Sequence, residues 1–135
     1  MNLKQLTLGI VTGASLASMV AIEVAKAADT IFMPGLVYRT GAYAPNGIPF
    51  ANGMKDYLTL INERDGGVNG VKIVHEECET GYNTKVGVEC YEKMKSKNPV
   101  TVIPNSTGIT YQLIPKTYAD KIPLLTMGYG RTSAA

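Results

Sequence analysis

Two adjacent hydroxyl groups follow an apolar run in the second half of the chain. The run Val100–Ile103 is followed, after one proline, by Asn105-Ser106-Thr107-Gly108. These groups, with the free backbone N–H groups of a helix start, can hold a carboxylate or another small polar group. The same residues also suit a plain helix cap, in which a side-chain oxygen accepts from the helix backbone. Ser106 and Thr107 are therefore candidates for either role.

Signatures of catalysis are weak in this chain. It has no Gly-x-Ser-x-Gly nucleophile elbow, no Gly-x-x-x-x-Gly-Lys phosphate loop and no His-Glu-x-x-His zinc motif. The single His75 falls in an apolar run, where a packed histidine is favoured over a catalytic base. The glutamates around Cys78 lack the converging ligands of a metal site and indicate a solvated loop. We predict no catalytic residue, no metal site and no cofactor.

Aromatic residues gather near the expected ligand side of the fold. Four of the eight tyrosines lie in or beside loops that follow apolar runs: Tyr43, Tyr82, Tyr111 and Tyr129. They suggest a wall for an apolar or aromatic ligand, although loop tyrosines also serve only to pack. Gly128-Tyr129-Gly130 matches part of a dinucleotide fingerprint, but no helical pattern follows it, which argues against that site.

The charge balance argues against one class of partner, and the N-terminus predicts that the chain is exported. The 13 Lys and Arg against 11 Asp and Glu give a net charge of +2, too small to indicate a nucleic-acid partner. Lys4, an apolar run over Leu6–Ile22 and a small-x-small pattern at Ala25–Ala27 are typical of a cleaved export signal. The run is short for a membrane span and is interrupted by hydroxyl residues. We predict a signal peptide over 1–27 and a periplasmic mature chain over 28–135.

The predicted export affects the oxidation state expected for the two cysteines. Cys78 and Cys90 would reach an oxidising compartment, where disulfides persist. Their spacing is not that of a Cys-x-x-Cys redox pair. One structural disulfide is favoured over two free thiols.

Apolar runs and helical stripes alternate along 28–135. Strands are expected over Thr30–Tyr38, Val71–His75, Val100–Ile103 and Ile122–Met127. Helices are expected over a stripe from Phe50 to Ile61 that begins near Pro49, over Val86–Met94, and after Ser106, where Ile109, Leu113 and Ala119 would point inward and Pro115 would kink the helix. The alternation predicts an α/β domain, an open parallel sheet with helices on both faces. Ligands bind such sheets at the carboxyl ends of the strands.

One segment resembles a known family. Residues 61–70 read Ile-Asn-Glu-Arg-Asp-Gly-Gly-Val-Asn-Gly. They resemble the Ile-Asn-x-x-Gly-Gly-Ile-x-Gly pattern of periplasmic substrate-binding proteins of branched-chain amino-acid-type ABC transporters, with one extra residue before the paired glycines. The exported N-terminus, the Gly/Pro-rich loop 40–47, the segment Pro104–Thr110 and Ile122–Leu125 match the same family in order. The resemblance therefore covers essentially all of 28–135.

The resemblance implies a type I periplasmic binding protein and not an enzyme. Such a protein closes two lobes on a small polar ligand, such as an amino acid, an amide or urea, or a related organic acid, and delivers it to an inner-membrane ABC permease. Residues 28–135 would form an N-terminal lobe truncated after its fourth strand, with apolar surface left uncovered. Alternatives are a truncated exported α/β enzyme domain and the ligand-sensing domain of a receptor with the same fold.

The resemblance also implies roles for particular residues. Ser106 and Thr107 would hold the polar head of the ligand, and Gly128 and Gly130 would offer backbone groups to it. Tyr129, with Tyr43, would shape the pocket for something other than a plain aliphatic amino acid. The family's frequent disulfide runs toward the third strand, so a bridge between Cys78 and Cys90 departs from the family pattern.

Overall fold

Strands and helices alternate through the part of the chain that the computed structural model describes, residues 30–127. The predicted signal peptide and Gly128, Tyr129 and Gly130 lie outside the described residues. In chain order the elements are β1 (Thr30–Val37), α1 (Ala44–Arg64), β2 (Lys72–Glu79), α2 (Thr84–Met94), a 3₁₀ turn η1 (Lys95–Lys97), β3 (Ile103–Pro104) and α3 (Thr107–Asp120).

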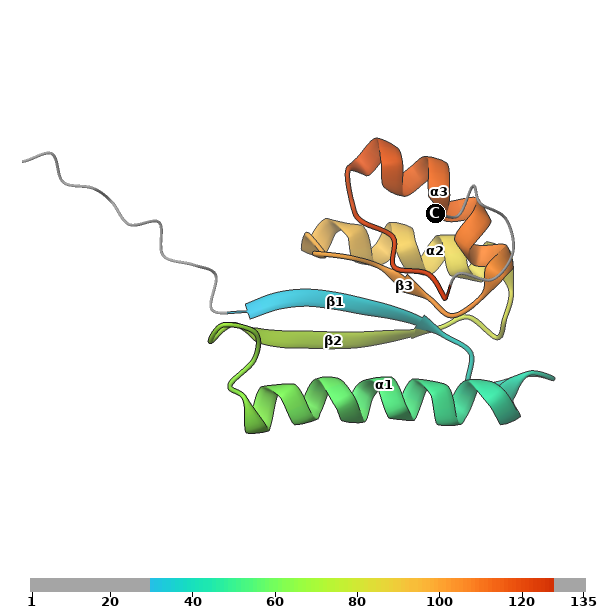
Figure 1. Cartoon of the computed structure of the whole chain (residues 1–135). Coiled ribbons are helices and arrows are strands. Elements are labelled where there is room, and N and C mark those ends of the chain that lie inside the picture. The colour runs from blue at the N-terminus through green and yellow to red at the C-terminus, as the bar shows by residue number, and fades with distance from the viewer. Residues whose placement is uncertain (1–29, 128–135) are drawn as a thin grey trace, which may run out of the picture.

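The three strands form a parallel sheet in the order β2-β1-β3. Helix α1 covers one face of the sheet, and α2 and α3 cover the other (Figure 1). The predicted α/β class, with a parallel sheet and helices on both faces, is confirmed.

The ladder between β1 and β2 is long, and the one between β1 and β3 is short. β1 pairs with β2 from Thr30↔Lys72 to Val37↔Glu79, so β2 extends past the predicted end at His75. The outer edge of β2 is covered by Asn62 of α1, whose amide donates to the Ile73 carbonyl oxygen at 2.7 Å and accepts from the Ile73 N–H at 2.8 Å. A side chain thus protects an edge that would otherwise be open to pairing.

The predicted fourth strand is reduced to a single parallel bridge between Val102 and Leu124. The Val102 N–H donates to the Pro123 carbonyl oxygen at 3.0 Å, and the Leu125 N–H donates to the Val102 carbonyl oxygen at 2.9 Å. Prolines explain the short ladder, because Pro104 and Pro123 have no N–H to donate. The direction of the predicted strand is right, but its length is wrong.

Helix α1 begins at Ala44, about one and a half turns before the predicted start. Pro45 lies in its first turn, where a missing N–H removes no helical bond, and Pro49 is accommodated inside the helix. Gly47 allows α1 to approach β1 closely, because a Cβ there would stand 1.8 Å from the carbonyl oxygen of Tyr38. At the other end, Gly66 and Gly67 adopt positive φ and close the helix.

The main core lies between the sheet and the pair α2 and α3. Its buried members are Leu36, Cys90, Tyr91, Met94, Val102, Ile109 and Leu113. The two helices approach closely at Gly87, where a Cβ would stand 2.5 Å from the Ile109 side chain. Ala119 is exposed, so its predicted inward position is wrong; Thr117 is buried instead, eight residues after Ile109 on the same helix face.

A disulfide joins Cys78 of β2 to Cys90 of α2. The two Cα atoms are 5.9 Å apart, a usual separation for such a bond. The bridge ties the edge strand of the sheet to the helix layer that forms the main core.

The opposite face of the sheet is less well covered. An apolar cavity of about 410 Å³ lies between α1 and the sheet, lined by Met33, Phe50, Met54, Tyr57, Leu58, Ile103, Leu125, Thr126 and Met127. Phe50 and Tyr57 belong to the predicted apolar stripe of α1, yet they are 43% and 61% exposed. The predicted stripe is thus only partly buried, because Leu58 is covered whereas Phe50 and Tyr57 are exposed.

Candidate ligand-binding edge of the sheet

Three loops meet at the carboxyl ends of the strands, next to the N-termini of all three helices (right side of Figure 1). The loops after β1 and β2 touch at their glycines, because a Cβ on Gly41 would stand 3.5 Å from the Gly81 carbonyl oxygen. The starts of α2 and α3 are equally close, because a Cβ on Gly108 would stand 3.1 Å from the Thr84 hydroxyl. The predicted residues Tyr43, Ser106 and Thr107 therefore share one edge of the sheet, called the carboxyl edge below.

Ser106 is the N-cap of α3. Its side-chain oxygen accepts from the Ile109 N–H at 3.5 Å, and its carbonyl oxygen accepts from the Thr110 N–H at 2.9 Å. The residue is 2% exposed. The hydroxyl can still donate its own hydrogen while it accepts at the cap. The structure therefore shows the capping role that the sequence left open for Ser106.

Thr107 and Gly108 form the first turn of α3. Thr107 is half-buried and Gly108 is exposed, so this turn is reached from the carboxyl edge. The backbone N–H groups of a first helical turn have no partner within the helix, and the helix dipole favours negative charge there. This turn can hold a carboxylate or another acceptor.

Asn105 is the polar residue of this segment to which sequence reasoning gave no role. It is fully buried, and its backbone N–H donates to the Leu36 carbonyl oxygen at 3.0 Å. Within residues 30–127, neither the oxygen nor the nitrogen of its side-chain amide has a hydrogen-bond partner. An unpartnered buried amide is costly and rare, so it calls for an explanation. Its position directly after an expected strand is the feature of the sequence that could have marked Asn105 as a site residue.

Three tyrosine rings pack together at the start of α1. The rings of Tyr43 and Tyr82 have centroids 4.5 Å apart at an interplanar angle of 38°, and those of Tyr38 and Tyr82 are 4.8 Å apart, edge to face. Tyr43 is the N-cap residue of α1 and is 55% exposed. Tyr38, at the other end of the group, is buried. The structure thus brings Tyr43 and Tyr82 together, whereas Tyr111 lies on α3.

The charged groups of the carboxyl edge are paired with one another. The Arg39 guanidinium donates to both oxygens of Glu77 at 2.7 Å and to the Asn52 side-chain oxygen at 2.7 Å. The hydrogen bond from Arg39 lowers the pKa of Glu77 below its ordinary value, even though burial raises it. Because the guanidinium is occupied in this way, Arg39 serves to join the strand ends rather than to bind an anion.

Glu79 joins the loops after β1 and β2 through hydrogen bonds. Its carboxylate accepts from the backbone N–H groups of Arg39 and Gly81, each at 2.7 Å, and from the Thr40 hydroxyl at 3.1 Å. Burial raises the pKa of Glu79, but these hydrogen bonds outweigh it and lower the pKa below its ordinary value. The position of the loop that carries Tyr43 is thus fixed by a charged group at the end of β2.

His75 belongs to β2 and lies away from this edge, on the face of the sheet that α1 covers. Its Nδ1 lies 2.7 Å from the Met33 carbonyl oxygen, and its ring is next to Gly35 and Met54. Within the described residues no three His, Cys, Asp or Glu side chains converge as metal ligands. A search of the same residues finds no helix with the length and hydropathy needed to cross a membrane.

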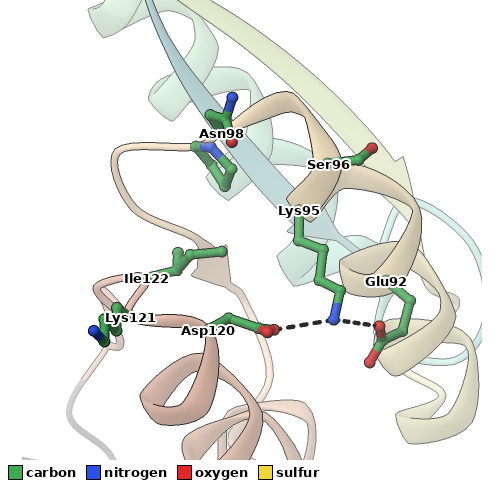
Figure 2. A pocket seen from close by; sticks show the side chains of 8 residues that line it. Glu92, Lys95, Ser96, Asn98, Asp120, Lys121 and Ile122 are labelled. Carbon is green, nitrogen blue, oxygen red and sulfur yellow. Dashed lines mark hydrogen bonds and ion pairs between the residues drawn. The ribbon is translucent and has the colours of Figure 1, made fainter.

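The opposite end of the sheet carries a polar pocket. A cavity of about 510 Å³ is lined by Glu92, Lys95, Ser96, Asn98, Pro99, Asp120, Lys121 and Ile122, at the C-terminal ends of α2 and α3. Figure 2 shows Lys95 reaching between Glu92 and Asp120, at 2.8 and 3.1 Å. The charges that line this pocket are largely neutralised by one another.

Comparisons with known proteins identify the family. The profile of the periplasmic binding protein family matches residues 30–135, and the chain belongs to that family. A search of curated proteins gives no match. The family consists of substrate-binding proteins, not enzymes, and is typically periplasmic or extracellular.

Solved structures agree with this assignment. An ABC transporter permease from the Pseudomonas fluorescens group is 44% identical with a TM-score of 0.70, over 77% of this chain and 26% of that one. The substrate-binding protein LivJ from Streptococcus pneumoniae, in complex with isoleucine, is 19% identical with a TM-score of 0.65, over 72% and 28%. A solute-binding protein from R. palustris, in complex with benzoate, is 18% identical with a TM-score of 0.59, over 72% and 27%. The chain spans about a quarter of the length of these proteins, and its fold is that of a lobe of a type I periplasmic binding protein.

Proposed function

We propose that this chain forms a ligand-binding lobe of the solute-binding component of an ABC importer. In this proposal residues 1–27 are a cleaved signal peptide, and the mature protein captures a small polar ligand in the periplasm. The ligand is an amino acid, an amide or urea, or a related organic acid. A second lobe closes over the ligand, and the closed protein delivers it to an inner-membrane permease. The protein itself catalyses no reaction and needs no cofactor.

One observation of the described residues supports this proposal most directly. The buried, unpartnered amide of Asn105 lies immediately before the accessible first turn of α3. Unsatisfied polar groups beside a helix N-terminus suit a ligand that carries an acceptor such as a carboxylate. Because Arg39 is paired with Glu77, the first turn of α3 is better placed than Arg39 to hold an anion at the carboxyl edge.

The proposal assigns roles to the residues of the edge. The backbone of Thr107 and Gly108, together with the hydroxyls of Ser106 and Thr107, holds the polar head of the ligand. Tyr43 forms part of the wall. By the family resemblance, Gly128 and Gly130 add backbone groups from the loop that follows Met127, and Tyr129 narrows the pocket.

A thermal screen of the full-length product of the gene that carries this sequence tests the proposal. Amino acids, ureas, amides and organic acids are added singly, and at least one class is expected to raise the midpoint of unfolding, because a ligand that binds only the folded protein stabilises it. If no compound does so, and an ester or a cofactor substrate is turned over instead, the transport function is wrong.

A matched pair of variants then locates the site. Thr107→Val removes a hydroxyl at the first turn of α3, and we expect about tenfold weaker binding of the stabilising ligand. Thr59→Val makes the same change at an exposed position of α1 and should leave the affinity unchanged. Equal affinities of the two variants would show that the ligand does not contact Thr107.

A further inference from the structure

Tyr82 adopts a backbone conformation that its side chain disfavours. The residues Thr80-Gly81-Tyr82-Asn83 form a tight turn in which the Asn83 N–H donates to the Thr80 carbonyl oxygen at 2.9 Å. Both central residues have positive φ, 56° at Gly81 and 62° at Tyr82. Glycine and asparagine suit such positions, whereas a bulky aromatic residue there is a true outlier. Strain of this kind persists only where the surroundings hold it.

The surroundings of Tyr82 do hold it. Its N–H donates to the Thr80 hydroxyl at 3.2 Å, and that hydroxyl donates to the Val37 carbonyl oxygen at 2.8 Å. Thr80 is buried, and its own N–H also donates to the Val37 carbonyl oxygen, at 2.8 Å. Glu79 adds the bond to the Gly81 N–H described above. The turn is therefore fixed to the end of β1, the strand that leads to Tyr43.

The half-buried Tyr82 ring contacts two other rings. It packs edge to face with the buried Tyr38 ring, which itself packs on Gly47 of α1. It also packs against Tyr43, whose ring remains 55% exposed. Tyr82 thus supports Tyr43 and leaves the Tyr43 ring open to solvent.

The aromatic group and the start of α3 are close to each other. Thr84, two residues after Tyr82, lies against Gly108 of α3, as the close approach at that glycine shows. Two residues of extended chain span about 7 Å, so the tyrosines and the first turn of α3 are within reach of one small ligand.

We propose that Tyr82 is a positioning residue that holds Tyr43 as an aromatic wall, and that the ligand is a carboxylate with a planar unsaturated group. This inference rests on the proposed function and adds the chemistry of the ligand. The carboxylate lies at the first turn of α3, and the planar group lies on the Tyr43 ring. Aromatic rings prefer offset or edge contacts with other rings, which a puckered saturated ring cannot reproduce.

Two pairs of probes test the ligand chemistry on the full-length gene product. Benzoate is compared with cyclohexanecarboxylate, and phenylalanine with cyclohexylalanine, by titration calorimetry. Each pair keeps the carboxylate and changes a planar ring into a puckered one. In at least one pair we expect the planar member to bind about tenfold more tightly.

Variants at Tyr82 separate positioning from folding. Tyr82→Asn removes the ring and suits the positive φ, so the lost ring packing and the relieved backbone strain offset each other in the midpoint of unfolding, while affinity for the planar probe falls about tenfold and affinity for the saturated one changes less than about twofold. Tyr82→Phe keeps the ring and should bind the planar probe within about twofold of the unchanged protein. Tyr118→Asn, at an 87% exposed position of α3, is the control and should change neither affinity.

Two results would overturn the inference while the proposed function stands. They are a ligand from the thermal screen with no preference for the planar member of either pair, and equal losses for both members in Tyr82→Asn. Failure of every small molecule to bind would instead reject the proposed function, and the inference with it.

Discussion

The two ends of the parallel sheet treat their polar groups in opposite ways. At the amino end, Lys95 bridges Glu92 and Asp120, Lys116 reaches Glu92 at 2.8 Å, and the Tyr91 hydroxyl donates to Asp120 at 2.6 Å. These groups join α2 to α3. At the carboxyl edge the ion pair of Arg39 with Glu77 joins strand ends, but the Asn105 amide is left buried without a partner. Positive φ occurs at both ends, at Tyr82 here and at Asn98 and Lys121 beside the amino-end pocket.

This contrast separates two uses of polar residues in one small lobe. Groups that satisfy one another contribute to folding, whereas unsatisfied or strained groups reduce stability and persist where a function needs them. The cavity of about 510 Å³ lies at the amino end, where the charged groups that line it are paired with one another. Cavity size alone would therefore point to the end of the sheet opposite the proposed site.

The largest effect is expected from the disulfide, which supports both ends by tying β2 to α2. Reduction, or the double change Cys78→Ala and Cys90→Ala, should lower the free energy of unfolding by about 3 kcal/mol, because the unfolded chain loses a constraint. Denaturant unfolding with and without reductant measures this. Intact mass is the control; two thiols that react with an alkylating agent before reduction would contradict the bridge.

Two asparagines give the next comparison. Asn105→Leu replaces an unpartnered buried amide with an apolar group of similar shape, and should raise the free energy of unfolding by about 1–2 kcal/mol. Asn62→Leu, its matched control, removes two hydrogen bonds to Ile73 and should lower that free energy by about 1–2 kcal/mol. If Asn105→Leu destabilises the protein as Asn62→Leu does, Asn105 has a structural partner. Ligand affinity should fall in Asn105→Leu alone.

At the amino end, Tyr91→Phe removes the hydrogen bond to Asp120 while keeping the buried ring. Loss of a hydrogen bond to a charged acceptor should lower the free energy of unfolding by about 1.5 kcal/mol. Ligand affinity should not change, since the residue lies at the other end of the sheet from the proposed site. A variant with weaker binding and unchanged stability would reverse the roles given to the two ends.

The smallest expected effect is a loss of folding stability at low pH. The hydrogen bond from Arg39 lowers the pKa of Glu77, and those from Tyr91 and Lys95 lower the pKa of Asp120. Since these pKa values are lower in the folded than in the unfolded protein, the stability they contribute is complete above the ordinary values of 4.5 and 3.8 and is lost as the pH falls through the folded values.

Unfolding midpoints measured from about pH 7 to pH 3 should therefore decrease below about pH 4.5. The decrease should be smaller in Tyr91→Phe, because Asp120 then loses the hydrogen bond that lowers its pKa most. Midpoints that rise toward pH 3 would contradict the sign of these shifts.

The sequence was sufficient for the class of fold, whereas the place of the site stays a prediction. Alternating apolar runs and helical stripes depend on local periodicity, which is why the order of the strands and helices is predicted well, although their bounds are not. The start of α1 was missed because Pro45 and Pro49 suggest a loop, yet a proline in the first helical turn costs no hydrogen bond.

Other features depend on contacts between distant parts of the chain. Nothing in the local pattern shows that Asn105 lacks a partner, since that depends on every element around it. The support of Tyr43 by Tyr82 likewise depends on a turn in which tyrosine replaces the expected glycine or asparagine. Sequence reasoning noted Tyr82 as one of several loop tyrosines but gave it no role of its own.

Hydrogen exchange with and without the compound that stabilises the protein most tests the central claim directly. If the ligand binds at the carboxyl edge, its addition should slow exchange in the segments 39–43 and 105–108 and leave the segments 92–98 and 120–122 unchanged. Slower exchange confined to 92–98 and 120–122 would place the ligand in the amino-end pocket and contradict the account.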